Sequence, residues 1–258
     1  MAKGIFHRTE LLFGSEKMNK LAEIKVIIFG IGGVGSWCAE SLIRSGICNL
    51  TIVDSDKISV SNINRQLQAT SKTIGQEKTE ALKNRLLEIN PAANITTVQK
   101  IYDKINHQEF ELESYHFIID SIDRLINKAH LIKTATQTKA VFISSMGAAL
   151  KLDPTLIKVG SFWEVKGCHM ARMLRKKLRK NETPIPNFTC VYSNELLENL
   201  NLEIPKPPSI IKLDQINSQS HKLPSKKALT NGSFAHTTAI YGFTIAGLIM
   251  KNIYDTHN

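Results

Sequence analysis

Short apolar runs and longer amphipathic stretches alternate along the first 145 residues of the chain. The runs have the length and the β-branched residues of strands buried on both faces, and they cover residues 24–29, 50–53, 95–98, 117–119 and 141–143. The stretches between them have the helical spacing of apolar residues, and they cover residues 36–45, 76–90 and 124–138. Strands that alternate with helices predict an α/β fold with a doubly wound, mostly parallel, Rossmann-like sheet.

The pattern changes after Gly147, where we expect a C-terminal α+β extension. A β-like stretch around Asp153 leads to a basic segment at 166–180. Residues 181–235 are rich in Pro, Ser, Asn and Lys, which predicts long surface loops. An apolar helix is expected after these loops.

This last apolar stretch, Thr237 to Met250, contains 14 residues, with three Thr and two Gly among them, and ends at Lys251. A bilayer span needs about 20 predominantly apolar residues. We therefore expect a buried helix or a subunit interface and no membrane span.

The chain of 258 residues is treated as a single unit, residues 1–258, in which 1–160 form the sheet-containing part and 161–258 the basic, loop-rich part. No apolar signal segment follows Met1, and the four cysteines are far apart without a Cys-x-x-Cys pair. This predicts a cytoplasmic protein without a structural zinc site or a disulfide scaffold.

A glycine-rich loop, GIGGVG at 30–35, joins the first predicted strand to the first predicted helix. In this context Gly30 permits a tight turn, Gly32 lets a phosphate approach the backbone, and Gly35 lets the helix pack on the strand. Asp54 follows the second strand, where a carboxylate accepts hydrogen bonds from ribose hydroxyls. Residues 1–160 are thus predicted to bind a nucleotide, and NAD, FAD and ATP all remain open at this point.

Charged residues near the same strand ends favour ATP. Arg65 and Lys78 are cations of the kind that stabilise the negative charge developing when a triphosphate is split between its α- and β-phosphates. Asp123 follows the fourth strand and offers the oxygen ligand that Mg²⁺ prefers.

These motifs resemble the ubiquitin-activating-type adenylating superfamily, which includes bacterial enzymes that adenylate sulfur carriers. The residues that carry the resemblance are DSD at 54–56, SNINRQ at 61–66, GQEK at 75–78 and DSID at 120–123. The resemblance implies a homodimer that binds ATP and Mg²⁺ and converts a carboxylate into an acyl-adenylate.

The same resemblance assigns roles to individual residues. It implies that Arg8 reaches the ATP of the opposite subunit and that Asp123 holds Mg²⁺; together with Arg65 and Lys78 these form the candidate catalytic set. The ATP site is expected to comprise Gly30, Gly32, Gly33, Gly35, Asp54, Asp56, Asn62, Arg65, Gln66 and Lys78.

Motifs in the second half narrow the resemblance to the tRNA threonylcarbamoyladenosine dehydratases. They are MGAALKLDPT at 146–155, ARMLRKKLRK at 171–180, CVYSNE at 190–195 and NGSFAHTTAIYG at 231–242. That family adenylates the threonyl carboxylate of threonylcarbamoyladenosine beside the tRNA anticodon, and the modification then cyclises on itself with release of AMP. Cys168 and Cys190 are formal candidates for a thioester step, but intramolecular attack makes such a step unnecessary, and we favour direct cyclisation.

The net charge of +10 is concentrated in the segment 166–180, which contributes +7 and leaves +3 for the rest of the chain. Met170, Leu174 and Leu178 recur every four residues in it, so a helix buries this stripe and presents cations on its other faces. Such a surface suits contacts to tRNA phosphates. The predicted contacts are Arg172, Arg175, Lys176, Lys177, Arg179 and Lys180.

Three alternatives remain open from the sequence. The first is an adenylating activator of a ubiquitin-like sulfur-carrier protein. The others are an NAD-dependent oxidoreductase with the same glycine loop and a non-catalytic tRNA-binding protein. A protein of a sulfur-transfer system also remains open as a partner.

Overall fold

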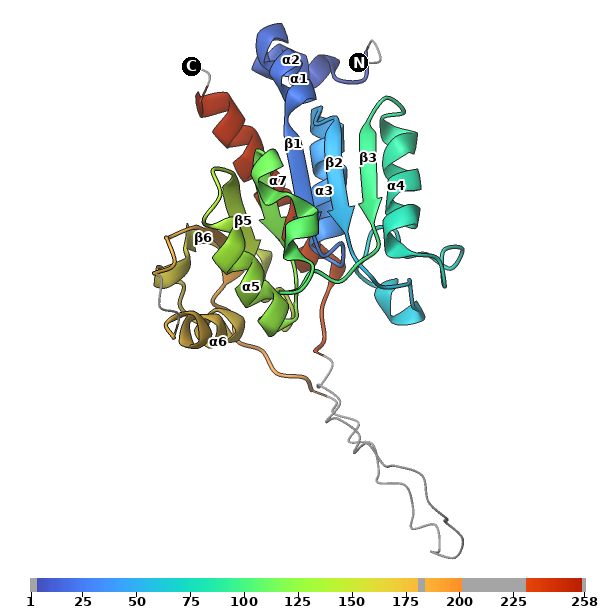
Figure 1. Ribbon diagram of the computed structural model, residues 1–258. Helices are drawn as coiled ribbons and strands as arrows, with labels where there is room; N and C mark the ends of the chain where they lie inside the picture. The colour runs from blue at the N-terminus through green and yellow to red at the C-terminus, as the bar shows by residue number, and fades with distance from the viewer. Residues whose placement is uncertain (1–3, 181–183, 201–230, 257–258) are drawn as a thin grey trace, which may run out of the picture.

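The computed structural model describes residues 4–180, 184–200 and 231–256. In this part of the chain one seven-stranded sheet has the order β3-β2-β1-β4-β5-β7-β6 (Figure 1). Its strands are β1 (Lys25–Phe29), β2 (Asn49–Val53), β3 (Asn94–Val98), β4 (Phe117–Asp120), β5 (Val141–Ser145), β6 (Ile157–Ser161) and β7 (Thr189–Ser193). Every pairing is parallel except that of β6 with β7. The predicted fold class is confirmed.

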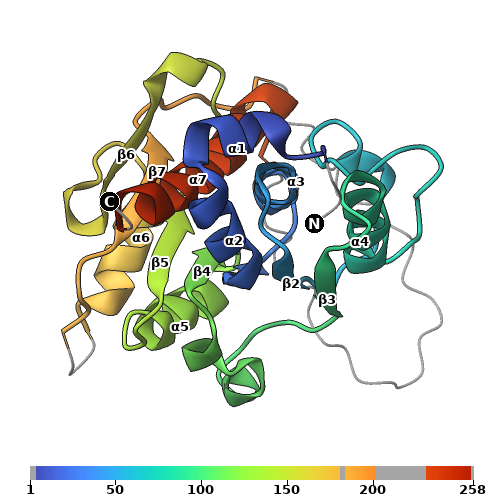
Figure 2. The ribbon, with the colours of Figure 1, turned by 90° about the horizontal axis from the view of Figure 1, so that it is seen from above.

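Helices cover both faces of the sheet. They are α1 (His7–Phe13), α2 (Ser15–Glu23), α3 (Gly35–Ser45), α4 (Lys78–Ile89), α5 (Leu125–Ala135), α6 (His169–Leu178) and α7 (Ala235–Thr256). Helices α2, α3, α4 and α7 pack on one face, and α5 and α6 pack on the other (Figures 1 and 2). Short 3-10 helices lie at Val60–Asn62, His107–Phe110, Leu112–Ser114, Pro154–Leu156 and Phe162–Glu164.

Strand β1 shows why polar and apolar residues do not alternate along the apolar runs. Val26 and Ile28 point into the core beneath α3, whereas Ile27 and Phe29 point into the core beneath α5. All four side chains are completely buried. A parallel sheet covered on both faces needs apolar residues at every position of its central strands.

The helix predicted after the glycine loop ends as expected at Gly46. This residue has φ +108° in the left-handed region, and its amide donates to the carbonyls of the last helical turn. The helix predicted over 76–90 is α4, which begins two residues later, and the helix predicted over 124–138 is α5, which ends earlier, at Ala135.

Strand β7 corrects the expectation that residues 181–235 form long surface loops. It pairs in parallel with β5 and buries Cys190 and Val191 completely. The prediction was wrong for these five residues because the polar composition of the long stretch concealed one short apolar run. The rest of that expectation falls largely on 181–183 and 201–230, which lie outside the described residues.

The final apolar stretch is a buried helix, as expected. Helix α7 packs along α3, and Tyr241, Ile245 and Ile249 are completely buried. Gly242 permits the close approach, because a Cβ atom there would lie 2.5 Å from the carbonyl oxygen of Val34. Among the described residues, no helix combines the length and the apolar character that crossing a membrane would require.

Candidate active site

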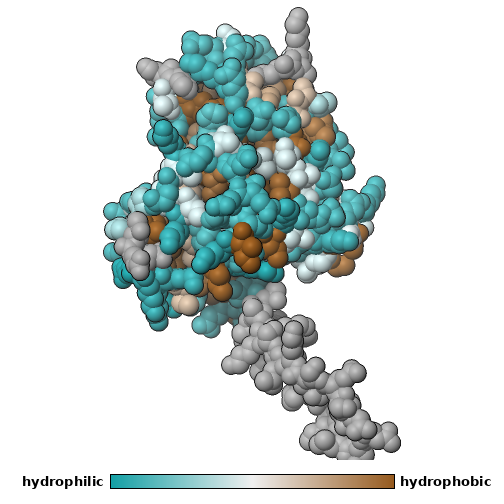
Figure 3. Space-filling model, in the orientation of Figure 1, coloured by the Kyte–Doolittle hydropathy of each residue, from teal (hydrophilic) through white to brown (hydrophobic). Residues whose placement is uncertain are grey.

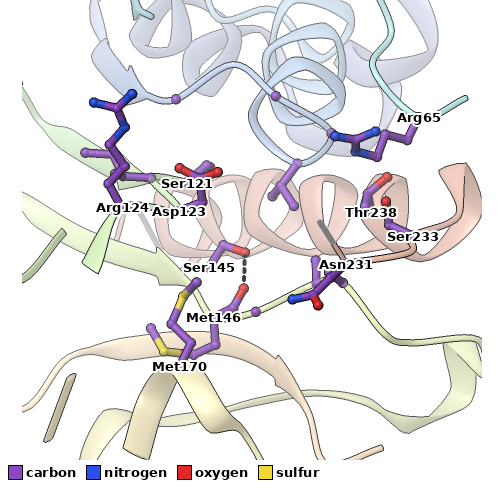
Figure 4. Close-up of a pocket in the computed structure, with 18 of the residues that line it drawn as sticks. Arg65, Ser121, Asp123, Arg124, Ser145, Met146, Met170, Asn231, Ser233 and Thr238 are labelled. Carbon is purple, nitrogen blue, oxygen red and sulfur yellow. Dashed lines mark hydrogen bonds between the residues drawn. The ribbon is translucent and has the colours of Figure 1, made fainter. Parts of the chain in front are cut away.

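One cavity of about 740 Å³ lies at the carboxyl ends of β1, β2, β4 and β5. We call its wall of residues 29–34, 53–78, 100–102 and 121–127 the glycine-loop side, and its wall of 145–151, 168–170, 196–197 and 231–238 the C-terminal side. Figure 4 shows both, with Arg65, Asp123 and Arg124 on the first and Ser145, Met170 and Asn231 on the second.

The predicted ATP residues converge on the glycine-loop side of this cavity, although they come from separate segments of the chain. Those that line it are Gly30, Gly32, Gly33, Asp54, Asp56, Asn62, Arg65, Gln66 and Lys78. Asp123, the predicted Mg²⁺ ligand, lines it as well. Gly35 and Arg8 are not among the lining residues.

Gly30 and Gly35 are required by the backbone packing. Gly30 has φ +83°, and a Cβ atom there would lie 2.8 Å from the carbonyl oxygen of Ser121. A Cβ at Gly35 would lie 2.0 Å from the carbonyl oxygen of Gly30. At Gly32, by contrast, the nearest atom is the Gln66 amide nitrogen at 3.8 Å. The space beside Gly32 is therefore open to a ligand, next to the uncapped first turn of α3.

Asp54, Asp56 and Lys78 form a preassembled charge cluster. Asp54 accepts hydrogen bonds from the amides of Ile31 at 3.0 Å and Asp56 at 2.9 Å. Lys78 Nζ lies 2.8 Å from Asp56 Oδ2 and 3.8 Å from Asp54 Oδ1. Burial raises the pKa of Asp54 above its ordinary range, although Lys78 and the two amides oppose this shift. The protein thus supplies its own counter-charges for Lys78.

The segment after Asp56 places Arg65 and Gln66 at the same cavity. Arg65 donates to the carbonyl oxygen of Ser61 at 2.8 Å and to Asn64 Oδ1 at 2.9 Å. Gln66 is buried, and no described residue donates to its side-chain oxygen. An orphaned buried acceptor that lines a cavity fits a ligand donor such as a ribose hydroxyl.

The turn after β4 is held by a fully buried ion pair that gave no signal in the sequence. Asp120 Oδ2 lies 2.7 Å from Lys128 Nζ and accepts a 2.6 Å hydrogen bond from Ser144. Its other oxygen accepts from the amide of Ile122 at 3.0 Å. The pair therefore fixes the turn that leads to Asp123.

Asp123 itself is exposed to the cavity and makes no hydrogen bond or ion pair with any described residue. The N-cap position of α5 is taken by Arg124, so Asp123 is not used to cap this helix. Mg²⁺ is held in proteins by one or two carboxylates together with substrate phosphates. One free carboxylate at the edge of a phosphate-binding loop fits that mode of binding.

Residues on the C-terminal side were not predicted as site residues, although their motifs carry the resemblance. Leu150 has φ +57°, in the left-handed region, and its amide donates to the carbonyl oxygen of Gly232 at 2.9 Å. Lys151 is buried, and burial lowers its pKa against the opposing effects of Cys168 and Glu195. Lining residues that were not predicted include Ser121, Arg124, Asn127, Ser145, Met146, Lys151, Asn231, Ser233 and Thr238. The DSID, MGAALKLDPT and NGSFAHTTAIYG motifs, which contain some of them, were the sequence signals that could have found them.

The two candidate cysteines occupy different positions. Cys168 lines the cavity, whereas Cys190 is completely buried in β7, away from the lining. Burial raises the pKa of the Cys190 thiol far above its ordinary value. Cys190 is therefore held as an unreactive thiol.

Helix α6 has the predicted apolar stripe, with Leu174 and Leu178 buried. Its first residue, His169, lines the cavity. The helix lies at the lower left in Figure 1, and the face of the molecule seen from this side is mostly hydrophilic (Figure 3). Arg175 is half-buried and donates to the carbonyl oxygen of Phe162 at 3.0 Å, so its guanidinium is turned inward. The other five predicted tRNA-contact residues are exposed.

Arg8 lies on α1, beyond the amino end of β1 and thus at the opposite end of the sheet from the cavity (Figure 1). The chain's own fold does not bring Arg8 to its own cavity.

Comparison with known proteins agrees with this geometry. The family model described as the ThiF family matches residues 6–257. The chain belongs to the ThiF family. Within it, the chain is 37% identical to the tRNA threonylcarbamoyladenosine dehydratase of Bacillus subtilis over 175 residues, which are 68% of this chain and 69% of that protein.

Two further members show how widely the similarity extends. The solved structure of the Escherichia coli tRNA N6-threonylcarbamoyladenosine dehydratase in complex with ATP matches with a TM-score of 0.81 at 28% identity and covers 98% of this chain and 94% of that one. The molybdopterin-synthase adenylyltransferase of Escherichia coli is 30% identical over 69% of this chain and 68% of that protein.

Proposed function

We propose that this chain is an ATP-dependent tRNA threonylcarbamoyladenosine dehydratase. The observation that carries the proposal is the cavity in which the predicted ATP residues face a second wall built from the 146–155 and 231–242 motifs. The relatives named above as tRNA threonylcarbamoyladenosine dehydratases, one of which matches nearly the whole chain in structure, support it.

The proposed chemistry has two steps. An oxygen of the threonyl carboxylate attacks the α-phosphorus of ATP, the bond to the β-phosphate oxygen breaks, and pyrophosphate leaves. In the acyl-adenylate the carbamoyl group then attacks the carbonyl carbon, AMP leaves with the carboxylate oxygen, and a proton is lost. The net result is loss of one water from the nucleoside.

The residues on the glycine-loop side support the first step. The open backbone beside Gly32 and the first turn of α3 bind phosphate, and Arg65 and Lys78 stabilise the charge that gathers on it. Asp123 would hold Mg²⁺, which neutralises phosphate charge when bound.

The second step needs no protein nucleophile. Cys190 is buried and its thiol pKa is raised, which argues against a thioester there. An intramolecular nucleophile has a high effective concentration. We therefore keep direct cyclisation as the proposed route.

A homodimer is part of the proposal. Arg8 is exposed on α1 and stands far from its own cavity, so it would serve the site of a partner copy. The neighbouring side chains of Leu11 and Leu12 are exposed and apolar, as expected of a surface that a second subunit covers.

The exposed cations of the α6 segment, without Arg175, are proposed to contact tRNA phosphates beside the cavity.

The proposed compartment is the cytoplasm, which the four free and separated cysteines support. Contact with a sulfur-transfer protein would show as retention of this chain on such a protein in a pull-down.

Activation of a ubiquitin-like sulfur carrier is the second candidate, favoured by the similarity to the molybdopterin-synthase adenylyltransferase. A carrier protein that ends in Gly-Gly would then support pyrophosphate exchange, and tRNA would not.

The deciding experiment is mass spectrometry of tRNA nucleosides after incubation with the chain, ATP and Mg²⁺. We expect threonylcarbamoyladenosine to lose one water and AMP to accumulate in equal amount. The same tRNA without the modification serves as the control. An unchanged nucleoside in the presence of bound ATP would contradict the proposal.

A further inference from the structure

Three lysines of the described structure are almost completely buried. Lys78 is 5% exposed, Lys128 is 0% exposed and Lys151 is 6% exposed. Two of them are paired inside the protein, since Lys78 lies 2.8 Å from Asp56 and Lys128 lies 2.7 Å from Asp120. A buried charge without a partner is costly, so this pairing is the ordinary state of a buried lysine.

Lys151 differs from the other two. Its ammonium donates to the backbone carbonyl oxygen of Glu195, and within the described ranges no carboxylate lies at ion-pair distance from it. The Glu195 carboxylate is engaged elsewhere and accepts from the amides of Leu152 at 2.8 Å and Asp153 at 3.1 Å. Lys151 is thus a buried cation that contacts the backbone of Glu195, while the Glu195 carboxylate accepts hydrogen bonds from backbone amides.

The chain around Lys151 is held in place by contacts on both sides. Leu150 adopts φ +57° and donates to Gly232, while a ring nitrogen of His236 bonds the carbonyl oxygen of Leu152 at 2.8 Å. Left-handed backbone at a non-glycine residue is strained and is found preferentially at functional sites. Lys151 also lines the cavity, so the fold holds a buried lysine without an ion-pair partner among the described residues beside the space that a ligand fills.

We infer that the Lys151 ammonium binds the carboxylate that becomes adenylated and holds it on the C-terminal side of the cavity, opposite the phosphate-binding loop. This inference rests on the proposed function and adds a substrate-binding residue to it. A carboxylate brings the missing counter-charge. The negative charges of this carboxylate and of the ATP triphosphate repel each other, and an ammonium fixed between protein and substrate reduces that repulsion.

The test compares Lys151→Met with Lys139→Met, a lysine at the amino end of β5, far from the cavity. We expect Lys151→Met to lower AMP release with modified tRNA by about 100-fold while calorimetric ATP binding is retained. Lys139→Met should match the parent chain. Lys151→Gln keeps a donor for the Glu195 carbonyl but no charge, so it should lose as much activity as Lys151→Met.

Two measurements separate substrate binding from a merely structural role. The parent chain should bind modified tRNA more tightly than the same tRNA without the modification, and Lys151→Met should lose this preference. Its Tm should equal or exceed that of the parent, because an unpaired buried charge has been removed.

Other outcomes overturn the inference. If the parent chain dehydrates the nucleoside and Lys151→Met does so equally well, Lys151 does not bind the carboxylate. If Cys168→Ala reproduces the loss, the ammonium acts through that thiol. A lowered Tm would make Lys151 a structural residue. If the parent chain itself leaves the modified nucleoside unchanged, the proposed function fails instead.

Discussion

The two sides of the cavity handle buried charge in opposite ways. On the glycine-loop side, Lys78 lies 2.8 Å from the Asp56 carboxylate, and the buried Lys128, which does not line the cavity, lies 2.7 Å from the Asp120 carboxylate. On the C-terminal side, Lys151 meets only a backbone carbonyl among the described residues. The buried lysine on the first side therefore has a counter-charge without a ligand, whereas Lys151 on the second side gains one from an anion that the ligand brings. A site that joins two substrates benefits from this division, because preformed charges position the nucleotide while an unpaired charge selects its reaction partner.

The largest effect is expected at Asp123, the carboxylate on the glycine-loop side that makes no ion pair with the described residues. Asp123→Asn should lower pyrophosphate exchange by about 1,000-fold, because it removes the proposed Mg²⁺ ligand without breaking any described contact of the fold. Circular dichroism should show an unchanged fold, and Glu113→Gln, which is exposed elsewhere, should retain activity. Exchange at the parent rate in Asp123→Asn would remove this residue from the site.

The next effect concerns the paired lysine. Lys128→Met strands the Asp120 carboxylate in the core and should cost about 3 kcal/mol or more in the free energy of unfolding. The double variant Asp120→Asn/Lys128→Met removes both charges and should recover most of this loss. Urea titrations measure the two values. Equal losses in the single and double variants would show that the two charges are not coupled.

A smaller effect is expected outside the cavity, on α6. The charge reversals Lys176→Glu and Lys177→Glu together should weaken tRNA binding about 10-fold and reduce the salt slope of the affinity by about 0.7 to 0.9 for each phosphate that the chain no longer neutralises. ATP binding on the glycine-loop side should not change, and Lys139→Glu provides the control. An unchanged affinity for tRNA would exclude α6 as a contact surface.

The smallest effect is a pH dependence of stability. The pKa of Lys151 is lowered by burial from its ordinary value of 10.5, so the folded state binds this proton less well than the unfolded state does. The stability of the parent chain should therefore rise as pH increases from the lowered pKa toward 10.5. Lys151→Met should lack this component, and its Tm advantage should shrink over the same range. Parallel pH profiles for the two chains would contradict an unpaired charge.

The sequence predicted which residues meet on the glycine-loop side because they follow motifs at strand ends; their roles in binding and catalysis stay predictions. Ten of the predicted site residues line the cavity, and Gly35, which does not, is explained by its packing against Gly30. Local spacing suffices here, since each residue follows a strand whose carboxyl end reaches the same edge of the sheet.

The same reasoning failed where an interaction depends on distant segments. The spacing along α6 did not predict that the Arg175 guanidinium donates to the carbonyl oxygen of Phe162 on the preceding segment, and its contact with tRNA stays a prediction. Strand β7 was overlooked because only its pairing with β5 and β6 makes this short run a strand. Lys128 gave no sequence signal at all, because its partner Asp120 lies on another element.

The amino-acid sequence by itself determined the alternation of strands β1 to β5 with helices α3 to α5, the glycine loop and the charges that follow the strand ends, because periodicity and turn chemistry are local properties of the chain. Only the tertiary structure decided which of these charges have partners. Pairing depends on side chains brought together from separate elements, as with Lys128 and Asp120, or held apart from the described carboxylates, as with Lys151. The free energy of a buried charge is set by that three-dimensional environment and cannot be read from its neighbours in sequence.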